Sequence, residues 1–407
     1  MSPSPNVDRR GVHSPLWTAS VCALFTLMTT LAAHADDYGA LGDEIVAHVR
    51  SQFLDAERAR AWSQKHAHYG AKAKNADDFD RLTNAALREL RASHTAYYPK
   101  DSSENIQLRS LYASIIKDPE PELESLGADF VKGTNGFFVR QVFLKGPAAE
   151  AGLLRGDRIV TADGKPFHPV RSLRGKDGIA VSLEVERAKN APRLRLSAIV
   201  KKTKPAEEWI AAQDAASQVL ERLGRRVAYA SIYSCAGPKP LELLQRLMDD
   251  RFGRAEALVL DLRNGWGGCP PEFLKLFNPI APTLRFVGRE GKERIWPASW
   301  RKPVVLLTNG NTRSGKEIVA FEFRKHAIGP VVGERTAGAF LAGRPISLSD
   351  GSLLYVAVER CEVDGVALEG NGVQPTVEVP DNLFYAAGAD PQLDRALNLA
   401  AELAAKG

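Results

Sequence analysis

Apolar residues between residue 36 and about residue 120 recur every three or four positions, with charged residues between them. This spacing places the apolar side chains on one face of a helix. It predicts helices over Asp43–Arg58 and Asp77–Ala92 and a shorter one near Ile106–Ile116. Residues 36–122 are therefore predicted to form an N-terminal helical segment.

The pattern changes in residues 123–203 to short alternating runs that are separated by glycine and proline, which is typical of strands and tight turns. The predicted strands are Gly136–Phe143, Arg158–Ala162, Ala180–Arg187 and Leu194–Val200, with a short helix at Pro147–Leu153. This region is predicted to be a β-rich domain inserted between two others.

From residue 204 to residue 407, short apolar runs alternate with helical ones, and the runs are apolar on both faces. Such runs indicate a sheet that is covered by helices on both sides, so the fold class is α/β. The predicted strands are Val227–Tyr233, Ala257–Leu262, Pro303–Thr308, Val331-Val332 and Leu353–Val358, the last followed by a hairpin turn at Asp364-Gly365.

The amino-acid composition mainly serves to exclude some classes of protein function. The 407 residues are 44% hydrophobic and 25% charged, with a net charge of +5. Lysine and arginine are spread among acidic residues and form no basic stripe, so nucleic-acid binding is not expected. No cysteine or histidine spacing suggests a metal site.

The N-terminus carries Arg9 and Arg10, then an apolar stretch from Leu16 to Ala33, then Ala33-His34-Ala35. This order is that of a signal peptide cut after Ala35, which predicts a secreted or periplasmic protein. The alternative is a membrane anchor, but serine and threonine residues interrupt the stretch. No stable membrane span is expected after cleavage, which also removes Cys22. Cys235 and Cys269 each follow a predicted strand, so a disulfide between them is one possibility, and three reduced thiols, with Cys361, are the other.

Residues 146–164, "GPAAEAGLLRGDRIVTADG", resemble a PDZ domain of the bacterial protease type. The resemblance implies that the loop Ser125-Leu126-Gly127-Ala128 holds the terminal carboxylate of a peptide, which adds to the sheet as a strand. The peptide-binding residues would be Leu126, Gly127 and Ala128. The alternative is a PDZ-shaped spacer without a working groove.

Ser314 opens a helix directly after a buried strand and a Gly/Asn turn. A serine at a helix start commonly caps free N–H groups. The same position also places backbone N–H groups beside its hydroxyl, where they can hold an oxyanion.

The surrounding segments decide between these readings. They are "ALVLDLRNGWGG" (257–268), "NGNTRSGKEIVAFEF" (309–323) and "GPVVGERTAGA" (329–339), with "SHTAYY" (93–98) before and "LEGNGVQPTVEV" (368–379) after them. In this order they resemble the C-terminal processing (tail-specific) serine peptidases and their tricorn-protease relatives. The resemblance implies a crotonase-like α/β core at 204–407 and hydrolysis of unfolded or C-terminally presented polypeptides through an acyl-enzyme, without metal or cofactor. It makes Ser314 the nucleophile and the N–H groups of Gly315 and Gly267 the oxyanion donors.

The resemblance also shows a departure. Family members of the Ser/Lys type carry a lysine base after Thr-x-Gly, whereas this chain has Ala339 there. Tricorn-like members use a histidine and a glutamate, which correspond to His94 as general acid/base and Glu369 as supporting carboxylate. Glu362 and Glu378 are alternatives to Glu369.

Lys316 is the alternative base, but residues two apart on a helix point to different faces, so it is otherwise expected to be a solvated surface lysine. Two other functions stay open: a family member that binds an apolar ligand or peptide without catalysis, and a PDZ scaffold that only recruits peptides. The sequence does not indicate the oligomeric state.

Overall fold

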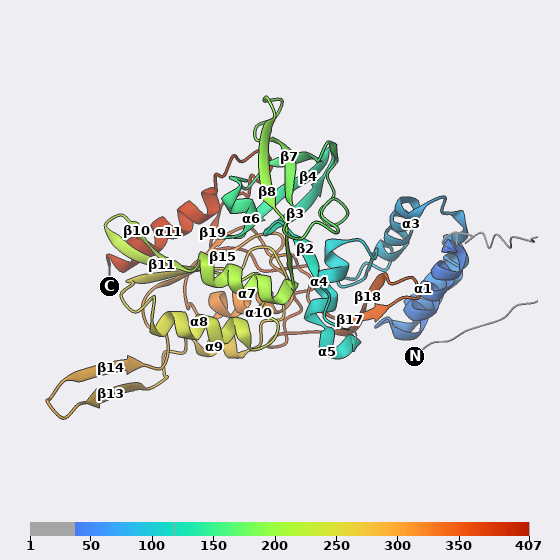
Figure 1. The fold of residues 1–407 in the computed structure, drawn as a ribbon. Coiled ribbons are helices and arrows are strands. Elements are labelled where there is room, and N and C mark those ends of the chain that lie inside the picture. Colours follow the sequence, from blue (N-terminus) through green and yellow to red (C-terminus); the bar gives the residue numbers. More distant parts are fainter. Residues whose placement is uncertain (1–36, 118, 407) are drawn as a thin grey trace, which may run out of the picture. The chain divides into compact units, whose positions relative to one another are not determined.

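A computed structural model describes residues 37–117 and 119–406 (Figure 1). The predicted signal peptide, residues 1–35, lies outside the described residues. Within them, no helix has both the length and the apolar character needed to cross a membrane.

The N-terminal segment is helical, as predicted. Its elements are α1 (Tyr38–Gln52), α2 (Ala56–Lys65), the 3₁₀ turn η1 (Tyr69–Lys72), α3 (Ala76–Arg88), α4 (Ser103–Leu111) and α5 (Ala113–Ile116). The single helix predicted over 43–58 is wrong, because the chain leaves the helix after Gln52 and Asp55 caps a new one by accepting a hydrogen bond from the Arg58 N–H at 3.0 Å. The helix predicted near 106–116 is likewise divided, at Tyr112.

A short strand joins this helical segment to the C-terminal part of the chain. β1 (Ala96–Tyr98) pairs antiparallel with β18 (Leu353–Arg360), which pairs in turn with β17 (Leu341–Ser347). Buried side chains of α1, α2 and α3 pack on these strands in one apolar cluster that includes Ile45, Phe79 and Leu354. The residues just before β1, Ser93 and His94, are thereby carried to the C-terminal half of the fold.

The β-rich domain has the predicted strands around its own apolar core, which includes Leu126, Val139 and Leu183. Its elements are β2 (Leu123–Ser125), β3 (Ala128–Gly133), β4 (Gly136–Val142), α6 (Pro147–Glu150), β5 (Arg158–Ala162), β6 (Lys165–Pro166), β7 (Ala180–Glu186), β8 (Leu194–Ile199) and β9 (Lys201–Thr203). The main sheet has the order β3-β4-β5-β7-β8, so β3 lies at its edge.

The C-terminal region is an α/β layer structure, as predicted. Its sheet has the order β10-β11-β12-β15-β16-β19, and the pairs from β11 to β19 are parallel. Alternate residues of the strands pack in two clusters: Leu258 and Leu306 with α8, α9 and α10, and Val259 and Val305 with α11. The strands are β10 (Gln218–Arg222), β11 (Arg225–Ser231), β12 (Ala257–Asp261), β15 (Val304–Thr308), β16 (Val331–Gly333) and β19 (Val377–Glu378), and the helices are α7 (Pro205–Ala216), α8 (Lys239–Asp249), α9 (Glu272–Lys275), α10 (Gly315–Lys325) and α11 (Pro391–Ala404).

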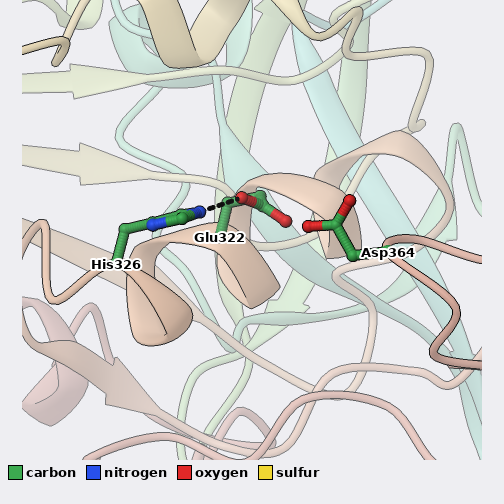
Figure 2. Close-up of side chains that lie close together, drawn as sticks. All are labelled: Glu322, His326 and Asp364. Atoms are coloured by element: carbon green, nitrogen blue, oxygen red, sulfur yellow. Dashed lines mark ion pairs between the residues drawn. The ribbon is translucent and has the colours of Figure 1, made fainter.

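Two features of this region were not predicted from the sequence. A hairpin of β13 (Thr283–Val287) and β14 (Glu293–Pro297) has every residue exposed (Figure 1). At the end of α10, Glu322 and His326 lie beside Asp364 of the predicted hairpin turn, which the bridge between Val363 and Val366 closes (Figure 2).

Candidate active site

Ser314 occupies the turn between the buried strand β15 and helix α10, where its backbone takes an unusual conformation. Its φ of 58° and ψ of −133° lie in a region that non-glycine residues rarely enter. The Ser314 N–H donates to the Ala339 carbonyl at 3.0 Å and to Glu317 Oε2 at 3.2 Å. The strain indicates that the surrounding contacts hold the residue in place.

Two glycines pack directly against Ser314. A Cβ atom at Gly267 would lie 2.5 Å from the Ser314 Cβ and 3.1 Å from the Gly315 nitrogen, and one at Gly315 would lie 2.5 Å from the Cys269 nitrogen. Only glycine allows the two loops to approach this closely. Within the described part of the chain, neither the Gly267 nor the Gly315 N–H has a hydrogen-bond acceptor, although both residues are buried. Two free backbone donors therefore lie beside Ser314.

Ser93, which was given no role from the sequence, connects the predicted histidine and glutamate, His94 and Glu369. Ser93 Oγ donates to Glu369 Oε2 at 2.7 Å and lies 2.9 Å from His94 Nδ1, while the Ser93 N–H donates to Glu369 Oε1 at 2.8 Å. Because a hydroxyl has one proton to donate, His94 Nδ1 must carry the proton in its bond to Ser93. The lone pair of the neutral ring is then on Nε2.

A continuous set of contacts connects this group to Ser314. Glu369 Oε2 also accepts from the Phe340 N–H at 2.7 Å, and the adjacent Ala339 carbonyl accepts from the Ser314 N–H at 3.0 Å. The contact of Ala339 with Ser314 is through its backbone carbonyl, and the side chain at this position has no group that accepts a proton. The alternatives Glu362 and Glu378 take no part in these hydrogen bonds, whereas Glu369 takes part in three.

The surroundings keep His94 neutral. Its side chain is buried, and its ring centroid lies 5.5 Å from that of Tyr355 on β18. Burial, with a smaller effect from the Arg313 guanidinium, lowers the pKa of His94 to about 3. An imidazole with this pKa is unprotonated at neutral pH, so its free nitrogen is available as an acceptor, but it is a weaker base than an ordinary histidine.

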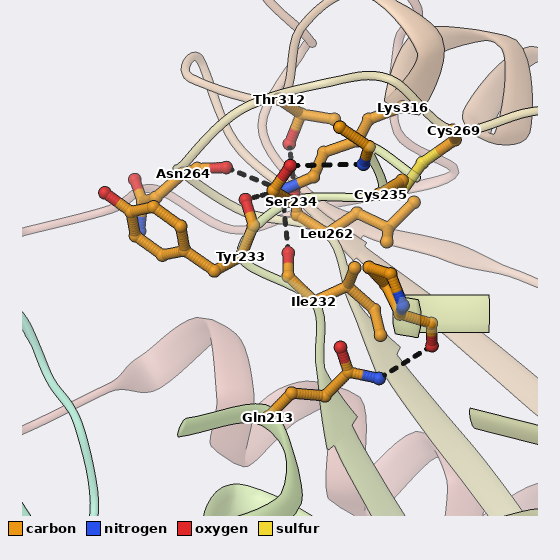
Figure 3. Close-up of a disulfide and its surroundings, with 12 residues drawn as sticks. Gln213, Ile232, Tyr233, Ser234, Cys235, Leu262, Asn264, Cys269, Thr312 and Lys316 are labelled. Atoms are coloured by element: carbon orange, nitrogen blue, oxygen red, sulfur yellow. Dashed lines mark hydrogen bonds between the residues drawn. A yellow bond between two sulfur atoms is a disulfide. The ribbon is translucent and has the colours of Figure 1, made fainter. Parts of the chain in front are cut away.

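Lys316 differs from its sequence-based expectation. The expectation of a solvated surface lysine is wrong: Lys316 is 0% exposed, and its Nζ donates to the carbonyls of Ile232 at 2.7 Å, Tyr233 at 3.1 Å and Asn264 at 2.7 Å (Figure 3). Burial lowers its pKa to about 7, while the three carbonyls match the three donors of the protonated ammonium. These bonds direct the amine to the loops that follow β11 and β12.

Cys235 and Cys269 form a disulfide, which the sequence had left open (Figure 3). It joins the loop after β11 to the loop that carries Gly267, and Cys361 is left with a free thiol. The bridge therefore fixes the glycine loop beside Ser314.

Replacing both bridged cysteines by serine is expected to lower the free energy of unfolding by about 3 kcal/mol, because the link constrains the unfolded chain. Urea denaturation under non-reducing conditions measures this difference. Cys361→Ser is the matched control and should change stability by less than about 0.5 kcal/mol. Equal effects in the two variants would contradict the role given to the bridge.

The predicted PDZ loop is partly closed on itself. The Gly127 N–H donates to Ser125 Oγ at 2.9 Å, and the Ala148 N–H donates to the Leu126 carbonyl at 2.6 Å. Ala128 begins the edge strand β3. The edge can accept an added strand, but a carboxylate that uses the Gly127 N–H has to displace the Ser125 hydroxyl.

Comparison with known proteins matches both regions to families. A family model described as peptidase family S41 matches residues 226–379, and a PDZ domain model matches residues 125–198. The chain is 25% identical over 284 residues to the carboxy-terminal processing protease CtpB of Bacillus subtilis (strain 168), covering 66% of this chain and 58% of the relative. It is 27% identical over 354 residues to putative tricorn protease homolog 2 of Streptomyces coelicolor (strain ATCC BAA-471 / A3(2) / M145), covering 80% of this chain and 29% of the relative.

Two solved structures share the fold. The tricorn protease matches with a TM-score of 0.55 at 21% identity, over 90% of this chain and 37% of that one. The photosystem II D1 C-terminal processing protease matches with a TM-score of 0.50 at 20% identity, over 89% of this chain and 97% of that one.

Proposed function

We propose that the chain is a serine peptidase of family S41 with Ser314 as its nucleophile, since residues 226–379 match the family model and residues 125–198 match a PDZ domain model. His94 acts as general acid and base through Nε2, and the N–H groups of Gly267 and Gly315 stabilise the oxyanion. Ser93 and Glu369 position His94. The observation that carries the proposal is the hydrogen-bonded series Glu369–Ser93–His94, which the backbone of Phe340 and Ala339 connects to a strained serine with two free N–H donors.

The proposed reaction has two steps. Ser314 Oγ attacks the peptide carbonyl while His94 Nε2 takes its proton, and His94 then gives this proton to the departing amine. Water hydrolyses the acyl-enzyme with His94 again acting as the base. Lys316 has no part in proton transfer in this scheme, because its amine is held on three carbonyls.

The substrates that we propose are unfolded polypeptides with a free C-terminus, which the PDZ domain binds along the edge of β3 through the loop Leu126–Ala128. We also propose that the protein is exported by its N-terminal signal and acts outside the cytoplasm. A disulfide beside the glycine loop supports this, because such bonds persist in oxidising compartments.

The direct test of the proposed function is incubation of the purified protein with an unfolded protein, followed by mass spectrometry of the products. A matched peptide pair, with a free or an amidated C-terminus, tests the proposed role of the PDZ domain. New peptide termini are expected, with faster cleavage of the free-carboxylate peptide. Absence of cleavage, together with retention of an apolar ligand or of peptide by the protein, would instead support the non-catalytic alternatives.

Ser93→Ala is expected to lower kcat about 10- to 100-fold with little change in KM, because His94 loses the partner that fixes its protonated nitrogen. Steady-state kinetics on a short peptide measures both constants. Ser93→Thr keeps a hydroxyl and should restore much of the rate. A change in KM alone would indicate that Ser93 contacts the substrate instead.

The lowered pKa of His94 predicts an unusual pH profile. Since a pKa of about 3 leaves the ring neutral at pH 5, kcat/KM should stay nearly constant between pH 8 and pH 5. A histidine with the ordinary pKa near 6.5 would lose about 30-fold at pH 5. Circular dichroism at each pH verifies that the protein stays folded, and a 30-fold fall in a folded sample would contradict the assignment.

A further inference from the structure

A second cluster of titratable side chains lies at the C-terminal end of α10, at the opposite end of the helix from Ser314 (Figure 2). Glu322 and His326 are one helical turn apart, and His326 Nε2 lies 2.9 Å from Glu322 Oε2. Asp364 approaches from the turn of the hairpin that follows β18. One ligand atom from each residue lies within 4.8 Å of the other two.

The carboxylate of Glu322 is buried, and the surrounding side chains do not satisfy all of its hydrogen-bonding capacity. The residue is 8% exposed, and Glu322 Oε1 has no hydrogen-bond partner among the described residues. Figure 2 shows that its carboxylate faces the carboxylate of Asp364. Both groups are acceptors when ionised, so neither can satisfy the other, and a buried carboxylate oxygen without a partner is destabilising.

We propose that Glu322, His326 and Asp364 bind a divalent transition metal, for which Zn²⁺ is the best match. One imidazole nitrogen and two carboxylates are a donor set that Zn²⁺ accepts, with a fourth position for water. Ca²⁺ fits poorly because it takes six or more oxygen ligands. The negative end of the α10 dipole adds a favourable field for a cation at this place.

The geometry requires only a small adjustment. Ligands of tetrahedral Zn²⁺ at about 2.0 Å lie about 3.3 Å apart. Because the three donor atoms all lie within 4.8 Å of one another, none of their separations has to shorten by more than about 1.5 Å. His326 and Asp364 are exposed and can shift once their present ion pairs are broken, whereas Glu322 is buried on the helix. The bound ion would connect α10 to the hairpin turn that contains Asp364.

One cation already competes for the site. Lys325 Nζ forms an ion pair with Asp364, and this is the largest cause of the lowered pKa of Asp364. Metal binding therefore has to displace the ammonium. Removal of Lys325 should tighten metal binding, whereas a purely structural role of the Lys325–Asp364 pair predicts only a loss of stability.

The test is calorimetric titration of the chelator-treated full chain with Zn²⁺, with Co²⁺ absorption spectra as a report on the ligands. One ion per chain is expected. His326→Ala and Glu322→Gln should each weaken binding about 10- to 100-fold or more, and Lys325→Gln should strengthen it. Because His326 is exposed, its replacement keeps the test valid even if Glu322→Gln fails to fold.

The chain offers a matched control at a second histidine–glutamate pair. His66 Nε2 lies 2.9 Å from Glu89 Oε2 and Lys65 bonds the same oxygen, but this pair is not part of any three-ligand group among the described residues. His66→Ala, and Cys361→Ser near the proposed site, should leave Zn²⁺ affinity unchanged. Either of two results would overturn the proposal: no stoichiometric binding of Zn²⁺, or binding that survives His326→Ala. If Zn²⁺ does not bind, a proton shared between the carboxyl groups of Glu322 and Asp364 would explain their approach instead.

Discussion

Ser314→Ala is expected to lower kcat for cleavage of an unfolded polypeptide by about 10⁴- to 10⁶-fold, the range seen when a serine nucleophile is removed. The physical reason is that the substitution removes the attacking oxygen from the side chain that lies against Gly267 and Gly315. Steady-state assays measure the loss, and circular dichroism verifies the fold of the variant.

Ser314 could instead serve only as a helix cap, and a variant of a second capping serine, Ser102, distinguishes this role from catalysis. Ser102 caps α4 by accepting a hydrogen bond from the Asn105 N–H at 3.1 Å and takes no part in the hydrogen bonds described for the site. Ser102→Ala should lower stability by about 1 kcal/mol and leave kcat unchanged. If Ser314→Ala shows only this pattern, Ser314 is a helix cap and the peptidase assignment is wrong.

Lys316→Met is expected to lower the free energy of unfolding by several kcal/mol. The change leaves the buried carbonyls of Ile232 and Asn264 without the donor that they have in the structure, and each such group costs about 1–3 kcal/mol, whereas the Tyr233 carbonyl still accepts from the Trp266 N–H. A domain has only about 5–15 kcal/mol of stability, so the variant should unfold at much lower denaturant or fail to accumulate as folded protein.

Lys325→Met, on the same helix but with its amine partly exposed, is the matched control and should change stability by less than about 1 kcal/mol. Chemical denaturation measures both variants. A Lys316→Met protein that is stably folded but inactive would contradict the structural role and identify Lys316 as the base.

The sequence predicted the order of the strands and helices well, because apolar periodicity reports directly on packing. The buried strands at 257–262 and 303–308 are present within one residue or so as β12 and β15. Helix ends were less accurate, as the break at Asp55 shows, because a capping residue inside an amphipathic stretch does not disturb its periodicity.

The site was predicted in part. The family resemblance placed Ser314, Gly267 and Gly315 in one site, whereas the local strand–turn–helix pattern alone fitted a helix cap at Ser314 equally well, and the structure brings the two glycines against the serine. The link from His94 to Glu369 depends on the pairing of β1 with β18, a contact between residues more than 250 positions apart that no local pattern reveals. Ser93 was missed for the same reason, although its place in "SHT" directly before His94 was the available signal.

The burial of Lys316 was not predicted, for a different reason. Charge normally keeps a lysine on the surface, and the rule that residues two apart on a helix diverge says only that it points away from Ser314. Its burial depends on three carbonyls from the ends of β11 and β12, which converge only in the folded sheet.

The most direct test of the central claim, that His94 activates Ser314, is labelling with a serine-directed fluorophosphonate followed by mass spectrometry. Such reagents modify only an activated hydroxyl, so the reaction requires no knowledge of the substrate. We expect Ser314 to be modified in the unmutated protein and His94→Gln to abolish the modification. Equal labelling of Ser314 in His94→Gln, or no labelling of the unmutated protein, would contradict it.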